Sequence, residues 1–246
     1  MKFTSRILAL LLLLCLPLNG LCETTSSFEA RTMETDEQPA LRCWLYAPAE
    51  PAENLPLIVY LHGGSGRGDD LNLLTDVDGF PRFLQTGQLG DLCAYVVMPQ
   101  LPANLRGWAN AADALEALIR SLKAELSIDE TRVSLTGHSM GGTGAWSLAA
   151  AKPSLFSRVA PLSGSIRCTP EALSALKTLS VWAFVGSADT IVPPQPSEEA
   201  VKRLQIAGAD ARLTILENAD HFSVPVLAYL DESHDLVDWL CFADFN

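Results

Sequence analysis

A serine lies between two glycines in the segment GHSMG at residues 137–141. The apolar run RVSLTG just before it predicts a strand, and the stretch GTGAWSLAAA after it begins a helix. Glycines beside such a sharp turn leave room for neighbouring chain segments, and the turn exposes the Ser139 hydroxyl at the sheet edge. The N-terminus of the helix supplies unpaired N–H groups where an oxyanion would form. This placement favours Ser139 as a nucleophile.

A serine hydroxyl at its ordinary pKa is a weak nucleophile and needs a base. Two histidines follow Ser139 in the chain, His221 and His234. His221 comes a few residues after the last apolar run, where a loop can carry it over the sheet to Ser139. His234 falls in a predicted terminal helix, and we interpret it as a solvated surface residue. His221 is therefore the candidate base.

The base in turn needs an acid that orients it. Asp189 follows the predicted strand SVWAFVG, and its loop reaches the same end of the sheet as Ser139. Asp220 is adjacent to His221, and we expect it to point away from the imidazole ring. Asp210 precedes the last predicted strand, at the opposite end of the sheet. Asp189 is therefore the candidate acid.

A glycine-rich segment, LHGGSGRGDD at residues 61–70, ends the first long apolar run. Its backbone can approach a substrate carbonyl and donate an N–H, for which we name Gly64, and Met140 N–H gives a second donor. A plain glycine turn is the alternative interpretation. We expect His62 to have a structural role, because its side chain would compete with His221 for one task.

Short apolar and β-branched runs alternate with helical patterns along the chain. The runs predict strands at 55–63, 93–99, 132–137, 156–164, 180–186 and 211–217, and the helical patterns include 112–126 and 197–208. In the second helix, Ser197 is predicted as the N-cap and Gly208 as the terminating glycine. The segment from Phe28 to Pro48 predicts an antiparallel hairpin turning near residues 36–38. The alternation predicts an α/β fold whose mostly parallel sheet is covered by helices on both faces.

The N-terminus has the composition of a secretory signal peptide. Lys2 and Arg6 precede an apolar run that ends at Leu18, and polar residues follow. A membrane anchor would need about 20 apolar residues, more than this run contains. We therefore predict a signal peptide at 1–22, cleavage before Glu23, one domain at 23–246 and a secreted or periplasmic location.

The rest of the chain is acidic. The formal charge of the chain is -12, and removal of Lys2 and Arg6 with the signal peptide gives -12 - 2 = -14. Such a surface repels phosphate backbones, so nucleic acid is not an expected partner. Because the N-terminal apolar run is too short to span a bilayer, we expect no membrane span in the mature protein.

Four cysteines lie beyond the predicted signal peptide: Cys43, Cys93, Cys168 and Cys241. Their spacing contains no C-x-x-C pair, so zinc has little support. Two disulfides and four buried free thiols are both compatible with this count.

Four of these segments, LHGGSGRGDD, VSLTGHSMGGTGAW, VWAFVGSADTIVPP and ADHFS, together resemble the α/β-hydrolase superfamily. Within it, the chain is similar to small secreted esterases, a group that includes proteins like feruloyl esterases, polyhydroxybutyrate depolymerases and dienelactone hydrolases, some of them described as predicted peptidases. The similarity covers about residues 40–245. It implies that Ser139, Asp189 and His221 form the catalytic triad and that Gly64 and Met140 form the oxyanion hole. The chain departs from many relatives in having Asp220, where they often have a glycine before the histidine.

The resemblance implies hydrolysis of carboxylic esters through an acyl-serine intermediate, without a metal or organic cofactor. A secreted acyltransferase or a peptidase with the same triad, or a non-catalytic binding protein of the same fold, are the alternatives. The short segment 165–179 cannot form a separate cap domain, so we expect an open cleft that accepts small or polymer-linked esters without interfacial activation. The loop 100–113 forms another wall, where Trp108 either offers an aromatic face to a substrate ring or serves packing.

The predicted export can be tested on protein recovered from a secreting host. Mass spectrometry is expected to find a mature N-terminus near Glu23. Thiol counting under denaturing, non-reducing conditions then distinguishes four free thiols from two disulfides. An intact Met1 on a membrane-embedded protein would contradict the export prediction.

Overall fold

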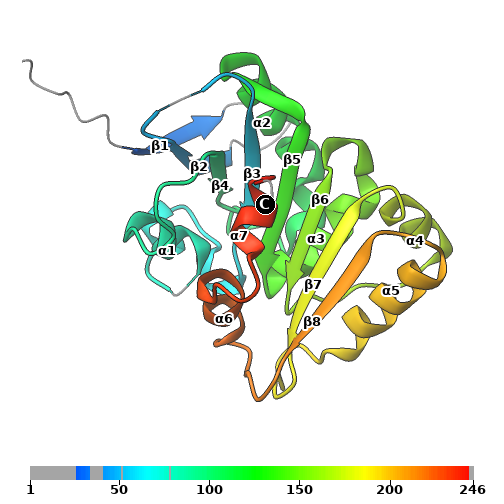
Figure 1. Ribbon diagram of the computed structural model, residues 1–246. Coiled ribbons are helices and arrows are strands. Elements are labelled where there is room, and N and C mark those ends of the chain that lie inside the picture. Colours follow the sequence, from blue (N-terminus) through cyan, green and yellow to red (C-terminus); the bar gives the residue numbers. More distant parts are fainter. Residues whose placement is uncertain (1–25, 34–40, 51, 78, 244–246) are drawn as a thin grey trace, which may run out of the picture.

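The computed structural model describes residues 26–33, 41–50, 52–77 and 79–243. An eight-stranded sheet crosses the molecule in the order β1-β2-β4-β3-β5-β6-β7-β8 (Figure 1). Strands β3 to β8 are parallel, whereas β2 is antiparallel to both β1 and β4. The strands are β1 Ser27–Met33, β2 Leu41–Ala47, β3 Leu55–Leu61, β4 Tyr95–Pro99, β5 Ile128–His138, β6 Arg158–Leu162, β7 Ser180–Gly186 and β8 Ala211–Leu216.

The predicted strands and the N-terminal hairpin pairing are confirmed. β1 pairs with β2 from Ser27 opposite Ala47 to Met33 opposite Leu41. The predicted turn of this hairpin lies outside the described residues, as does the predicted signal peptide.

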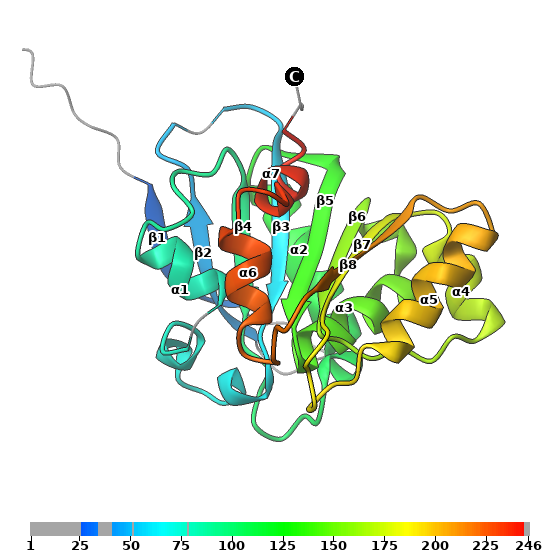
Figure 2. The same cartoon turned by 60° about the horizontal axis from the view of Figure 1, so that its bottom comes forward.

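Helices cover both faces of the sheet, as the alternating pattern predicts. One face carries α2 Ala112–Glu125, α3 Met140–Ala151, α4 Pro170–Leu176 and α5 Gln195–Ile206; the other carries α1 Phe80–Gln85, α6 Val224–Leu230 and α7 Leu236–Leu240. Figure 2 shows α1, α6 and α7 together in front of the sheet. Among the described residues, four short 3-10 helices lie in the connections: η1 Gly64–Gly66, η2 Leu71–Leu74, η3 Trp108–Ala111 and η4 Pro153–Leu155.

Strand β3 shows why the sheet is buried on both sides. Its side chains alternate between two hydrophobic clusters, with Leu57 and Val59 in one and Ile58 and Tyr60 in the other. Successive side chains of a strand point to opposite faces, so a central strand covered on both faces must be apolar throughout. This explains the continuous apolar run in the sequence.

The start of α5 corrects one prediction. The helix begins at Gln195, after Pro194, and Ser197 is buried inside it instead of capping it. Proline favours the first turn of a helix because its φ angle is already helical, and Pro196 occupies that turn, so the helix starts earlier than Ser197 suggests. Gly208 ends the helix as predicted, with φ +78° and its N–H bonded to Gln205 O at 2.9 Å.

The connection between β6 and β7 contains a single short helix, α4. Residues 163–179 therefore form no cap domain, in agreement with the sequence. Within the part of the chain that the structure describes, no helix is long and apolar enough to cross a membrane.

The first turn of α3 packs directly against the carboxyl ends of two strands. A Cβ atom on Gly141 would overlap Leu61 O of β3, and one on Gly142 would overlap Leu162 O of β6. Side chains are excluded here because backbone approaches backbone. The glycines around the serine are thus required by packing.

We predict that Gly141→Ala lowers the free energy of unfolding by roughly 1–3 kcal/mol, because the added methyl group must displace backbone. Urea denaturation measures the loss. Gly107→Ala is the matched control, since Gly107 has an extended backbone and no atom lies within 4 Å of its Cβ position. Equal stability of the two variants would show that the close approach is not a constraint.

Candidate active site

Three loops at the carboxyl ends of β5, β7 and β8 bring Ser139, Asp189 and His221 together. His221 Nε2 lies 2.9 Å from Ser139 Oγ, and His221 Nδ1 lies 2.8 Å from Asp189 Oδ2. Asp189 and His221 are buried, whereas Ser139 is partly exposed. The structure thus places the three predicted site residues in one hydrogen-bonded chain.

Ser139 occupies a strained backbone conformation between β5 and α3. Its φ of 60° and ψ of -117° are unusual for a residue with a side chain. Ser139 N–H donates to Leu162 O at 3.0 Å, and Ser139 O accepts from Thr143 N at 2.9 Å. These bonds hold the turn from both sides, so the hydroxyl has a fixed position.

Asp189 is held as a carboxylate by its own loop. Its Oδ1 accepts hydrogen bonds from the N–H groups of Ile191 and Val192, both at 2.9 Å. Burial alone would raise the pKa of Asp189, but the bonds from Val192, His221 and Ile191 together lower it below its ordinary value. A carboxylate can only accept, so His221 Nδ1 carries the proton and Nε2 presents a lone pair to Ser139.

Asp220 is turned away from the imidazole ring, as predicted. Its carboxylate accepts from Phe222 N–H at 3.1 Å, from Ser223 N–H at 2.8 Å and from the Ser223 hydroxyl at 2.8 Å. These bonds close the loop that carries His221. Asp220 therefore braces this loop and leaves the bond between His221 and Ser139 intact.

Asp210 and His234 lie outside the site. Asp210 O accepts from Val181 N–H at the beginning of β7, the sheet end opposite Ser139, as predicted. His234 corrects an expectation: it precedes α7, and its side chain is only 22% exposed. Its ring packs against Phe184 at 5.7 Å between centroids, so it is not a solvated helix residue.

Two backbone segments flank Ser139. The first bond within α3 is that from Thr143 to Ser139 O, so Met140 N–H has no acceptor inside the helix. On the other side, a Cβ atom on Gly63 would lie 3.6 Å from Ser139 Cβ, and Gly64 begins η1 directly after it. The predicted donors Gly64 and Met140 are thus on the two segments that flank the nucleophile.

His62 joins two loops beneath this glycine segment. Its Nδ1 donates to Gly63 O at 2.6 Å and its Nε2 accepts from Leu101 N–H at 2.9 Å. Burial lowers the pKa of His62 to about 4, so the ring is neutral, as these bonds require. The interpretation of His62 as a structural residue agrees with this arrangement.

Trp108 supports the same loop. Its position corrects the prediction that its ring binds substrate. Its side chain is 1% exposed, its Nε1–H donates to His62 O at 3.0 Å, and its ring meets the His62 ring edge-on at 4.9 Å. The indole therefore offers no free face to a substrate ring. Packing, the other interpretation of this residue, explains its position.

Sequence reasoning assigned no role to His138 or Ser163, although both lie beside the triad. The centre of the His138 ring lies 4.6 Å from that of the His221 ring, and His138 Nε2 is buried without a partner. Burial, and to a smaller extent the neighbouring His221, lower the pKa of His138 to about 4. Ser163 is buried with φ 43°, and its hydroxyl helps to lower the pKa of Asp189 without forming a well-aligned hydrogen bond. Because His138 directly precedes Ser139 in the GHSMG segment, its position in the sequence already indicated that it lies beside the site. Nothing in the sequence indicates that Ser163 does.

An apolar groove of about 420 Å³ begins one turn of α3 beyond the nucleophile. Thr143, Trp146 and Ile166 are among its lining residues, and Ser165 N–H donates to the Thr143 hydroxyl at 3.0 Å. The groove follows α3 toward α4.

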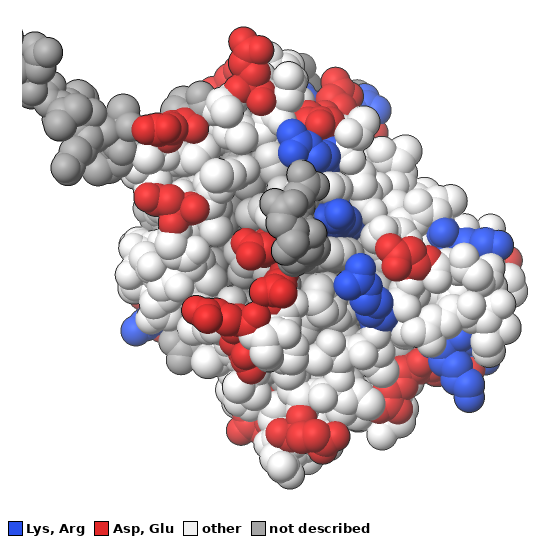
Figure 3. Space-filling model, in the orientation of Figure 1, with Lys and Arg blue, Asp and Glu red and all other residues white. Residues whose placement is uncertain are grey.

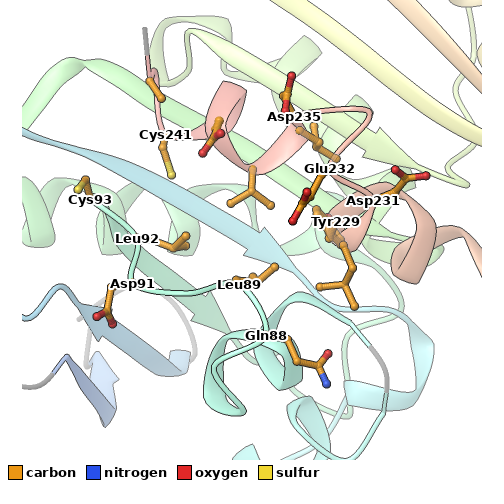
Figure 4. A pocket seen from close by; sticks show the side chains of 15 residues that line it. Gln88, Leu89, Asp91, Leu92, Cys93, Tyr229, Asp231, Glu232, Asp235 and Cys241 are labelled. Atoms are coloured by element: carbon orange, nitrogen blue, oxygen red, sulfur yellow. The ribbon is translucent and has the colours of Figure 1, made fainter. Parts of the chain in front are cut away.

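A second cleft, of about 360 Å³, lies away from the triad between the segment before β4 and the C-terminal helices (Figure 4). Its lining includes five acidic side chains and no lysine or arginine: Asp91, Asp231, Glu232, Asp235 and Asp238. Figure 3 shows acidic residues gathered around α6 and α7 on this face. Among the residues with described positions, no group of three or more histidine, cysteine, aspartate or glutamate side chains is arranged to hold a metal ion.

The mostly parallel sheet, the strained serine turn and the order Ser139, Asp189, His221 along the chain define an α/β-hydrolase. Residues 94–229, more than half of the chain, match the family described as the Dienelactone hydrolase family. The chain belongs to the dienelactone hydrolase family.

Known proteins support this classification. The chain is 30% identical over 154 residues to the putative esterase NocK of Nocardia uniformis subsp. tsuyamanensis, an alignment that covers 60% of this chain and 43% of NocK. Its fold is similar to the crystal structure of a thermostable esterase, with a TM-score of 0.73 and 27% identity over 87% of this chain and 62% of that one. The chain therefore spans less than two thirds of the length of either relative.

A third similarity concerns the fold alone. A feruloyl esterase module from Clostridium thermocellum, solved with sinapinate, has a TM-score of 0.67 at 17% identity. The alignment covers 90% of this chain and 89% of the module, so the two folds correspond over most of both chains.

We predict that His62 makes the protein less stable as the pH falls from about 6.5 to about 4. In this window the unfolded chain binds a proton that folded His62 does not, so the free energy of unfolding decreases by up to about 3 kcal/mol. Urea denaturation at several pH values should show a shallower dependence in His62→Gln, whatever its stability at neutral pH. The same dependence in both proteins would contradict a neutral, buried His62.

Proposed function

We propose that this protein is a serine hydrolase that cleaves carboxylic esters through an acyl-serine intermediate. The observation that carries the proposal is the continuous hydrogen-bonded chain from Asp189 through His221 to Ser139. The strained turn and the free N–H groups beside it supply the remaining parts of such a site.

In the first half-reaction, Ser139 Oγ attacks the ester carbonyl carbon while its proton passes to His221 Nε2. Asp189 stabilises the imidazolium that forms, through its bond to Nδ1. The tetrahedral oxyanion accepts hydrogen bonds from Met140 N–H and Gly64 N–H. The tetrahedral intermediate then expels the alkoxy group, which takes the proton from Nε2 and leaves as the alcohol.

In the second half-reaction, water attacks the acyl-serine and gives a proton to His221 Nε2. The new tetrahedral intermediate expels Ser139 Oγ, which regains that proton, and the carboxylic acid is released. These reaction steps use only groups of the chain and water.

Esters are the substrate class best supported by the relatives, since NocK and the thermostable esterase are described as esterases. The β6–β7 connection contains one short helix, α4, and forms no cap over Ser139. We therefore propose soluble or polymer-linked esters as substrates, without interfacial activation. We also propose export of the enzyme, on the signal-peptide composition of residues 1–22.

We predict that a fluorophosphonate labels the protein and that Ser139→Ala abolishes labelling. Ser139→Ala, His221→Ala and Asp189→Asn should each lower ester hydrolysis by roughly 10³-fold or more, because the three residues act as a unit. Hydrolysis of short acyl esters and circular dichroism of each variant are the measurements.

His234→Ala is the matched control for His221→Ala, because its ring lies outside the site and it should retain nearly full activity. Near-complete turnover by Ser139→Ala would refute the proposed mechanism.

A further inference from the structure

Two large apolar side chains are exposed on the loops that carry the acid and the base. Phe222 is 70% exposed and directly follows His221, and Ile191 is 56% exposed two residues after Asp189. Single exposed apolar residues are common on protein surfaces. Two exposed apolar side chains beside the hydrogen-bonded pair Asp189 and His221 indicate a surface that substrate covers.

Hydrogen bonds from their backbone N–H groups to aspartate side chains fix both residues relative to the triad. Phe222 N–H donates to Asp220 Oδ1 at 3.1 Å, and Ile191 N–H donates to Asp189 Oδ1 at 2.9 Å. The Phe222 ring meets the His221 ring edge-on, with 5.5 Å between centroids and 83° between planes. The aromatic side chain therefore stands against the catalytic imidazole and still exposes most of its area.

The chemistry of ester cleavage decides which half of the substrate lies there. His221 Nε2 must protonate the leaving oxygen, so the alcohol half of the ester has to lie on the imidazole side of Ser139. The apolar groove that begins at Thr143 is lined by residues of α3, of α4 and of the segment between β6 and α4, and neither His221 nor Phe222 is among its lining residues.

We propose that Phe222 and Ile191 form an apolar subsite for the alcohol half of the ester. This inference rests on the proposed function and specifies its substrate class: esters of neutral aryl, arylalkyl or larger alkyl alcohols. An aromatic ring on the alcohol gains contact with the Phe222 ring. The exposed Asp220 beside Phe222 disfavours anionic alcohols.

The test compares two series of esters on wild type and Phe222→Ala. In the first series the acyl group stays acetyl while the alcohol changes from methanol through butanol to benzyl alcohol. In the second series the alcohol stays methanol while the acyl chain lengthens. Each kcat/KM is expressed as the ratio of wild type to variant, which removes differences in intrinsic ester reactivity.

We expect Phe222→Ala to lower kcat/KM for benzyl acetate by about 5- to 30-fold and to leave methyl acetate within about twofold, because only the larger alcohol covers the ring. Hydrolysis of the acetyl-enzyme, measured after acylation is complete, should be unchanged, since the alcohol has left. Ile191→Ala should give a smaller loss of the same kind, and Phe222→Leu should restore most activity toward butyl acetate.

Ile206→Ala is the matched control. Ile206 is 77% exposed at the end of α5, which leads into the start of β8 and so lies at the end of the strands opposite the triad. It should change neither series.

Three results would overturn the subsite. An equal loss for methyl and benzyl acetate would mean that Phe222 only positions His221. A loss that grows with acyl length would assign Phe222 to the acyl half, and no loss would show that the ring is not covered. Failure of wild type to hydrolyse esters or to be labelled at Ser139 would instead reject the proposed function, so the two failures are distinguishable.

Discussion

The first turn of α3 must pass the carbonyl ends of β3 and β6 with no side chain between them. Gly141 lies against Leu61 O and Gly142 against Leu162 O. This contact forces the chain to reverse within one residue, and Ser139 takes up the strain with a positive φ. Because the reversal is so tight, the serine hydroxyl and the free N–H groups of the helix emerge at the same place.

A second set of contacts fixes the positions of the neighbouring loops relative to that turn. His62 bonds to the backbone of Gly63 and Leu101, and Trp108 closes over it from the loop before α2. A Cβ on Gly144 would in turn overlap the Trp108 ring, so α3 and this loop are packed together. Both ring nitrogens of His62 and the Trp108 indole N–H have partners within the protein, which fixes the glycine segment beside Ser139.

Asp189 and His221 depend on the ends of β7 and β8 in the same manner. Asp189 is desolvated, yet backbone donors of its own loop stabilise its charge, so the imidazole receives an oriented, ionised partner. Asp220 braces the histidine loop and leaves Phe222 outside. The proposed alcohol subsite is based on two features: the polar groups of the triad are rigidly held, and the apolar Phe222 ring beside them is exposed.

The sequence by itself determined the order of strands and helices along the chain. It also determined the end of the sheet at which Ser139, Asp189 and His221 meet. Local patterns suffice for this, since the carboxyl ends of parallel strands share one edge and short loops cannot leave it. Only the tertiary structure decided the roles of Ser197, Trp108, His138 and Ser163. Ser197 bonds to Gly164 O, Trp108 is buried on His62, and His138 and Ser163 lie beside residues distant in the chain. Their environments are made by segments that the fold brings together, and no pattern of neighbouring residues encodes such contacts.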